Sequence, residues 1–186
     1  MNHFYDVGAA GGEAFDSYLW RAPFAGWAVW CFEPSPRKWP ALVAKAETVA
    51  EKYQVHLCPF ALGGTTETAR LWEKTEWFGD SLAECTASDH WTENLACAFE
   101  IRVPVVRISD FILQNTAPAD RIVLKLDAEG AEFPILDDLL GCPAALARVS
   151  NILVEFHTVI PSPPRTKETL SALFSTIGRP LEPWLF

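Results

Sequence analysis

The stretch HFYDVGAAGGEAF, residues 3–15, decides the fold of this chain. A short apolar run containing Asp6 leads into a glycine-rich turn, and the residues after the turn have helical spacing. This pattern is typical of a strand, a tight turn and the start of a helix. Because glycine has no Cβ, Gly8 and Gly12 allow positive φ angles and a close approach by a ligand. The stretch predicts a nucleotide-binding turn, although glycine-rich turns also occur in α/β proteins that bind no nucleotide.

The spacing of the glycines separates two classes of cofactor. A dinucleotide fingerprint has the order G-x-G-x-x-G, whereas here Gly8 is followed by two alanines and then by Gly11 and Gly12. The spacing therefore argues against NAD. An acid near the end of the first strand, followed by G-A-x-x-G, resembles the first motif of Rossmann-like S-adenosylmethionine-dependent methyltransferases.

The composition limits the size and the partners of the protein. A chain of 186 residues suits one well-buried domain, so we expect a single domain over residues 1–186, with an irregular insertion at about 65–100. The net charge of −9 opposes a nucleic-acid partner, because such binding depends on clustered Lys and Arg. We find neither a membrane-spanning apolar run nor a signal-peptide pattern at the N-terminus, and expect a cytoplasmic protein without a membrane partner.

The five cysteines show no C-x-x-C pair, so they indicate neither a zinc site nor a redox motif. We expect most of them to be small buried apolar residues.

The first half of the chain predicts alternating strands and helices. Helices are expected at residues 13–21 and 36–53, and strands at 27–33 and 54–58. Glu33 ends the second strand, 21 residues beyond Gly12. A Rossmann-type unit places an acid at about this separation to bind the ribose hydroxyls. The alternative for Glu33 is a solvated carboxylate at a strand end.

The middle of the chain is less regular. An apolar loop at residues 59–64 could hold an adenine ring, with Phe60, Ala61 and Leu62 as candidates, though core packing is as plausible for each. The insertion carries tryptophans that predict either a substrate lid or ordinary core packing. Pro104 favours an edge strand or a bulge within residues 101–108.

The second half contains two further strands with polar residues at their ends. The stretch RIVLKLDAEGAE, residues 121–132, predicts a buried strand, an acidic turn and a helix, with Lys125 and Asp127 on one face. A buried lysine needs a charged partner, and the neighbouring carboxylates can supply one. The stretch NILVEFH, residues 151–157, predicts another strand, with Glu155 and His157 on one face. A last helix at 166–177 and a short strand within 180–186 complete the prediction.

This order of elements predicts an α/β protein with a Rossmann-like, mostly parallel doubly wound sheet flanked by helices. The ligand site of such a sheet lies at the carboxyl ends of the strands.

Six stretches, taken together and in order, resemble the successive motifs of the FkbM-type methyltransferase family. They are FYDVGA at 4–9, CFEPSP at 31–36, ALG at 61–63, DSL at 80–82, LKLDAEGAE at 124–132 and ILVEFH at 152–157. The resemblance implies a class I methyltransferase fold. It also implies methyl transfer from S-adenosylmethionine to a small-molecule acceptor, in many members a hydroxyl of a sugar or polyketide.

The resemblance also assigns cofactor-binding residues. Asp6, Gly8 and Gly12 would cradle the methionine end of the cofactor, with Ala10 in the same turn, and Glu33 would hold the ribose. Ala10 departs from the asparagine that is frequent in the family. An alternative function is a catalytically silent S-adenosylmethionine-binding or interaction module, suggested by a chain that starts directly at the first strand and ends early.

A hydroxyl acceptor must lose its proton as the methyl group arrives, and a placed base accelerates such a step by about 10²- to 10⁴-fold. The candidate catalytic residues are Asp127, His157 and Glu129. We prefer His157 as the base, because its ordinary pKa is about 6.5, and Asp127 as the acceptor anchor. Alternatively, Asp127 and Glu129 only neutralise Lys125 and cap the next helix. A metal held by Asp127, Glu155 and His157 is conceivable, but the expectation is no metal.

Overall fold

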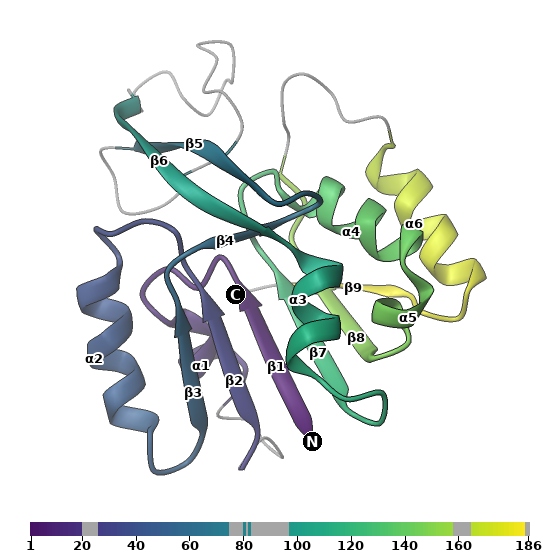
Figure 1. Ribbon diagram of the computed structural model, residues 1–186, viewed down its shortest axis with the longest axis horizontal. Helices are drawn as coiled ribbons and strands as arrows, with labels where there is room; N and C mark the ends of the chain where they lie inside the picture. The colour runs from purple at the N-terminus through teal and green to yellow at the C-terminus, as the bar shows by residue number, and fades with distance from the viewer. Residues whose placement is uncertain (20–25, 75–79, 81, 83–96, 158–164, 185–186) are drawn as a thin grey trace.

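The computed structural model describes residues 1–19, 26–74, 80, 82, 97–157 and 165–184. Its centre is a six-stranded sheet in which every neighbouring pair of strands is parallel (Figure 1). The strands, in spatial order, are β3 (Gln54–Cys58), β2 (Ala28–Phe32), β1 (Asn2–Val7), β7 (Arg121–Leu126), β8 (Val149–Val154) and β9 (Leu181–Pro183). The predicted Rossmann-like α/β fold is confirmed.

The chain reverses its direction of winding at β1. From this strand it proceeds to β2 and β3 on one side, and later to β7, β8 and β9 on the other. Such a switch point leaves a crevice at the carboxyl ends of the two diverging strands. The amide of Asp127 donates to the carbonyl of Val7, and the amide of Glu155 donates to that of Leu126. The residues that follow β1, β7 and β8 are therefore held side by side.

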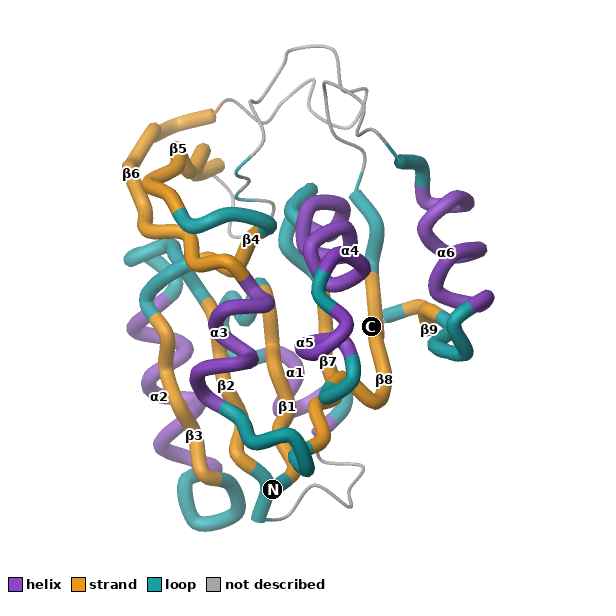
Figure 2. The backbone as a smooth tube through the Cα atoms, turned by 45° about the vertical axis from the view of Figure 1, so that its right-hand side comes forward, coloured by secondary structure: helices purple, strands orange, loops and turns teal. Residues whose placement is uncertain are grey.

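Helices cover both faces of this sheet, and the side chains of β1 alternate between them. Tyr5 and Val7 belong to a core cluster with residues of four helices: α3 (Ile108–Asn115), α4 (Glu132–Gly141), α5 (Pro143–Leu146) and α6 (Lys167–Thr176). Phe4 belongs to a second cluster, with residues of α1 (Glu13–Ser17) and α2 (Trp39–Val49). Figure 2 shows α3 and α2 on opposite sides of the sheet.

A second, three-stranded sheet lies beyond the carboxyl ends of the first (Figure 1). It has the order β4 (Ala61–Gly63), β6 (Cys97–Arg107) and β5 (Glu67–Lys74), with β4 parallel and β5 antiparallel to β6. The apolar loop expected at residues 59–64 is thus partly a strand. Within the insertion expected at 65–100, the described residues include β5 and the beginning of β6, which pair with each other in antiparallel orientation.

Pro104 lies in the middle strand of this small sheet, not in an edge strand. It pairs with Thr68 of β5, whereas β4 pairs only with the residues from Val105 onward. Proline lacks an amide hydrogen and cannot donate a backbone hydrogen bond. Because Pro104 precedes the first residue of β6 that pairs with β4, no hydrogen bond between β4 and β6 is lost.

The helices differ from the prediction mainly at their ends. The helix expected over residues 13–21 ends at Ser17, and the helix expected over 36–53 spans Trp39–Val49. The helix α3 was not predicted, because Ile108 was included in the preceding strand. Of the tryptophans in the insertion, for which a substrate lid or core packing was expected, Trp72 lies on β5, while Trp77 and Trp91 lie outside the described residues. No helix in the described part of the chain is long and apolar enough to cross a membrane.

Candidate active site

A cavity of about 450 Å³ opens at the carboxyl ends of β1, β2, β7 and β8. Eight of the residues predicted to bind the cofactor or to act in catalysis line this cavity: Gly8, Ala10, Glu33, Ala61, Leu62, Asp127, Glu129 and His157. The structure therefore brings together residues that are separated by up to 149 positions in the sequence.

The glycine-rich turn is packed tightly against the end of β7. Gly8 has a φ of 77°, and a Cβ at this position would lie 1.8 Å from the carbonyl oxygen of Asp127. The amides of Gly8 and Ala9 both donate to the carbonyl of Phe32. Only glycine can occupy position 8 without displacing this backbone.

Glu33 joins the second strand to this turn. Its side chain is buried, and its two carboxylate oxygens accept hydrogen bonds from the amides of Ala10 (2.9 Å) and Ser35 (2.8 Å). Burial raises the pKa of Glu33, although the charge of Lys38 and the two amide donors oppose that shift. The carboxylate is thus fixed in orientation on the cavity wall.

Lys125 is buried and has carboxylate partners, as the sequence predicted. Its Nζ lies 2.9 Å from Asp6 Oδ1 and 3.3 Å from Asp127 Oδ2, and it donates to the carbonyl of Gly8 at 2.8 Å. Burial lowers the pKa of Lys125, but the charges of Asp6 and Asp127 outweigh it, and the pKa is raised. Lys125 therefore ties β1, β7 and the turn together.

Three predicted cofactor-binding residues lie away from the cavity lining. Asp6 is buried, and its carboxylate contacts the cavity residue Lys125. Gly12 is the N-cap of α1 and lines a separate shallow hollow between α1 and α2. Phe60 packs against Phe32 and Phe111, with ring centroids 5.8 and 5.9 Å away, as its core-packing alternative predicted.

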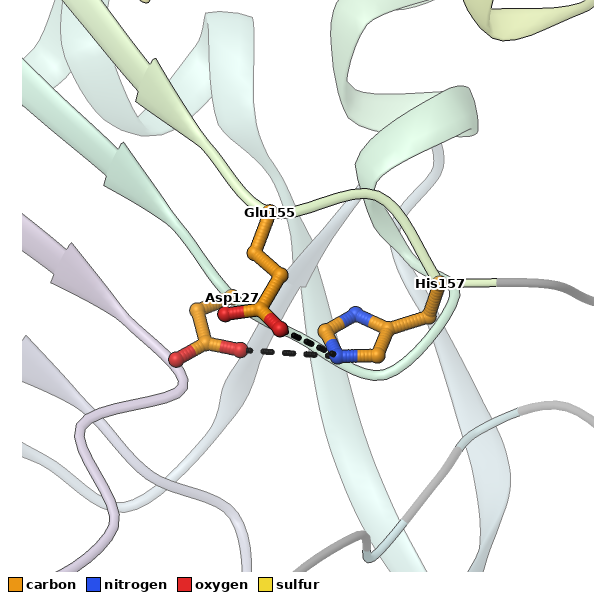
Figure 3. A group of neighbouring side chains, drawn as sticks. All are labelled: Asp127, Glu155 and His157. Carbon is orange, nitrogen blue, oxygen red and sulfur yellow. Dashed lines mark ion pairs between the residues drawn. The ribbon is translucent and has the colours of Figure 1, made fainter. Parts of the chain in front are cut away.

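His157 lies at the other end of the cavity, among carboxylates from two loops (Figure 3). Its Nδ1 is 3.0 Å from Oε1 of Glu132, whose buried side chain also accepts hydrogen bonds from the amides of Ala128 and Gly130. Its Nε2 lies 3.8 Å from a carboxylate oxygen of each of three residues: Asp127, Glu129 and Glu155.

The surrounding carboxylates change the pKa of His157. Burial lowers its pKa, but the hydrogen bond to Glu132 and the charges of Glu129, Glu132 and Asp127 raise it to about 9. The imidazole therefore already carries its proton at neutral pH. The ordinary pKa of about 6.5, on which the prediction of a His157 base rested, does not apply in this environment.

Some cavity residues were not singled out as site residues from the sequence. Lys38 pairs with Asp80 at 3.4 Å, and Glu13 reaches the cavity from the first turn of α1. Asp80 belongs to a quoted motif, but no local pattern marks Lys38. The Ser35 hydroxyl donates to Glu73 of β5, which attaches the small sheet to the wall of the site.

The family model described as "Methyltransferase FkbM domain" matches residues 6–174. The chain belongs to the FkbM methyltransferase family. This confirms the resemblance drawn from the sequence motifs, and the matched range includes all the described residues that line the cavity.

A solved structure, the FkbM methyltransferase from Methylobacillus flagellatus KT, is also similar to the chain. The two share 15% sequence identity with a TM-score of 0.47, over 76% of this chain and 30% of that protein. The chain thus spans less than a third of the length of this FkbM relative. None of the curated proteins matches the chain.

Proposed function

We propose that this FkbM family member transfers a methyl group from S-adenosylmethionine to a hydroxyl oxygen of a small metabolite of the sugar or polyketide type. Membership of the family supports methyl transfer. The identity of the donor, the oxygen acceptor and the roles of individual residues are the proposal.

The observation that carries this proposal is the layout of the cavity. Glu33 and the glycine-rich turn form one part of its wall, and the acidic residues around His157 form another. A donor with its ribose at Glu33 could present its methyl group near Asp127. The volume of about 450 Å³ falls within the range of about 300–1,000 Å³ that is usual for small-molecule sites.

The charge of the cavity supports a cationic donor. Among the described residues, six carboxylates line it: Glu13, Glu33, Asp80, Asp127, Glu129 and Glu155. The lining lysines, Lys38 and Lys125, are each within 3.4 Å of a carboxylate. The sulfonium and ammonium groups of S-adenosylmethionine suit such a wall, whereas the pyrophosphate of NAD would be repelled.

The reaction would be a displacement at the methyl carbon. The acceptor oxygen forms a bond to carbon as the carbon–sulfur bond breaks, and the electron pair stays on sulfur. Asp127 is held at Oδ2 by Lys125 and can anchor the acceptor through Oδ1. The hydroxyl proton would pass to Glu129, which is 30% exposed and can release it to water.

Calorimetric titration with S-adenosylhomocysteine tests the donor site. We expect micromolar binding by the unmodified protein, at least tenfold weaker binding by Glu33→Gln, and no measurable binding of NADH. Glu47→Gln is the control, because it makes the same change at an exposed position on α2. Equal affinities for the Glu33 and Glu47 variants would contradict the proposal.

Transfer of a labelled methyl group to a panel of hydroxyl compounds tests the chemistry. We expect turnover that falls at least tenfold in Glu129→Gln, while affinity for S-adenosylhomocysteine is kept. Tight binding with no transfer to any acceptor would favour the silent binding module instead.

A further inference from the structure

Three side chains at the acceptor end of the cavity direct ligand atoms toward one another. Asp127, Glu155 and His157 each offer one atom, and all three atoms lie within 4.8 Å of one another (Figure 3). Asp127 follows β7, and the other two follow β8, its neighbour in the sheet. Their convergence is therefore set by the main sheet.

The separations suit a shared cation better than direct bonding. His157 Nε2 lies 3.8 Å from Asp127 Oδ1 and 3.8 Å from Glu155 Oε1, which is too far for a hydrogen bond. Nitrogen and oxygen ligands lie about 2.0–2.2 Å from a zinc ion, so the atoms of a ligand pair are roughly 3–4 Å apart. Small side-chain movements would bring all three atoms within bonding distance of one ion. Because His157 carries a proton at neutral pH, binding of the ion at Nε2 would release one proton to water.

An independent feature outside this trio prepares His157 as a ligand. Its Nδ1 is bonded to the wholly buried Glu132, which is itself held by the amides of Ala128 and Gly130. This contact fixes the ring and directs Nε2 toward Asp127 and Glu155. A carboxylate behind the imidazole is the usual arrangement for histidines that bind metal ions.

We propose that Asp127, Glu155 and His157 bind a divalent cation of the Mn²⁺ or Zn²⁺ class. An imidazole combined with carboxylates favours these cations over Ca²⁺ and Mg²⁺, which prefer oxygen ligands alone. Three protein ligands leave coordination positions open, as in catalytic metal sites.

The open positions suggest an acceptor class, and this step rests on the proposed methyl transfer. A hydroxyl with a second oxygen on the adjacent carbon, as in a vicinal diol or an α-hydroxy carbonyl compound, can chelate the cation through both oxygens. The cation stabilises the alkoxide, and the hydroxyl proton passes to Glu129 and then to water. The alkoxide takes the methyl group, and the carbon–sulfur electron pair remains on the neutral thioether.

Titration of metal-free protein with Mn²⁺, followed by electron paramagnetic resonance, tests the site directly. We expect one site of micromolar affinity that Zn²⁺ displaces and Mg²⁺ displaces only at much higher concentration. His157→Gln and Glu155→Gln should each weaken Mn²⁺ binding at least tenfold. Glu13→Gln is the matched control, since it removes a carboxylate from the same cavity outside the trio, and it should leave the affinity unchanged.

Two outcomes overturn the site: no Mn²⁺ binding by folded protein, or equal binding by the His157, Glu155 and Glu13 variants. Calorimetry with S-adenosylhomocysteine on the same metal-free samples separates this result from the proposed function. Cation binding that requires His157, without cofactor binding, would uphold the site and refute the methyl donor. Binding of S-adenosylhomocysteine without binding of the cation would support the methyl donor and refute the cation site.

Discussion

At the scale of single residues, Gly8 has the strictest requirement in the turn. An alanine there must adopt a positive φ and also displace the carbonyl of Asp127, 1.8 Å from the new Cβ. The positive φ alone costs about 1–2 kcal/mol. We expect Gly8→Ala to lower the free energy of unfolding by at least about 3 kcal/mol, measured by urea denaturation.

Gly178→Ala is the control for that measurement. Gly178 has a similar φ of 74°, but a Cβ there meets no atom within 4 Å, so the variant isolates the backbone strain. Equal losses in the two variants would mean that the close contact with Asp127 has no energetic weight.

Some residue contacts could be predicted and others could not. The need of Lys125 for carboxylate partners follows from burial alone, and Asp127 is two positions away, directly after the same strand. The partnership with Asp6 depends on the register of β1 against β7, which pairs Asp6 with Lys125 across 119 positions. Local sequence patterns carry no information on that register, so Asp6 was expected at the cofactor instead.

At the scale of elements, Lys125 links β1 to β7. Lys125→Met would leave two carboxylates without their buried partner, and breaking a buried pair in this way costs about 3–5 kcal/mol. We expect that loss in the free energy of unfolding. Lys45→Met is the control, because the pair between Lys45 and Asp16 is exposed and worth at most about 1 kcal/mol.

A recovery experiment sharpens this prediction. In the double variant Asp6→Asn with Lys125→Met, one unpaired charge is removed, so part of the lost stability should return. No recovery would contradict an electrostatic origin of the loss.

The start of α6 offers a second test among the elements. Thr166 is its N-cap, and its hydroxyl accepts a hydrogen bond from the amide of Thr169 at 3.3 Å. Thr166→Ala should lower the free energy of unfolding by about 1 kcal/mol, because the amide loses its partner. Thr166→Ser keeps the acceptor and should cost much less; similar losses in both variants would exclude capping as the cause.

The elements that were predicted correctly have a strong local pattern. The apolar runs of β1, β2, β7 and β8 and the helical periodicity of α2 and α6 are visible in the sequence. The strand β4 has only three residues and gains its stability from β6, more than 40 positions away, so its local sequence predicts a loop. The signal for α3 was present in the spacing of Ile108, Phe111 and Ile112, but Ile108 also continued the strand pattern before it.

At the scale of the whole molecule, the core should make the protein sensitive to alkali. Burial raises the pKa of the Cys58 thiol to about 12, and it also raises those of Cys31 and Tyr5. Between the unfolded and folded pKa values, the unfolded chain has lost these protons and the native protein has kept them. The free energy of unfolding therefore falls as pH rises above about 9, by about 1.4 kcal/mol per pH unit for each group.

Urea denaturation between pH 7 and pH 11 measures this slope, and Tyr5→Phe isolates one contribution. The Tyr5 hydroxyl is buried and has no hydrogen-bond partner among the described residues, so its removal should leave stability at pH 7 unchanged or slightly higher. Above pH 10 the slope should become shallower by about 1.4 kcal/mol per pH unit. An unchanged slope would show that Tyr5 does not keep its proton in the native state.

The arrangement of the chain places the cavity where the sheet changes its direction of winding. Carboxyl ends of β1, β2, β7 and β8 meet there, and the small sheet lies beyond them (Figure 1). The location of the cavity could be predicted from the order of strands and helices alone. The charge of the cavity could not be predicted, because it depends on which carboxylates are paired with Lys38, Lys125 and His157.

A crystal structure of the protein with S-adenosylhomocysteine tests the central claim most directly. We expect density in the cavity, with the ribose hydroxyls at the Glu33 carboxylate and the sulfur directed toward Asp127. Density outside the cavity, or a ligand with its ribose at His157 and its sulfur at Glu33, would contradict it.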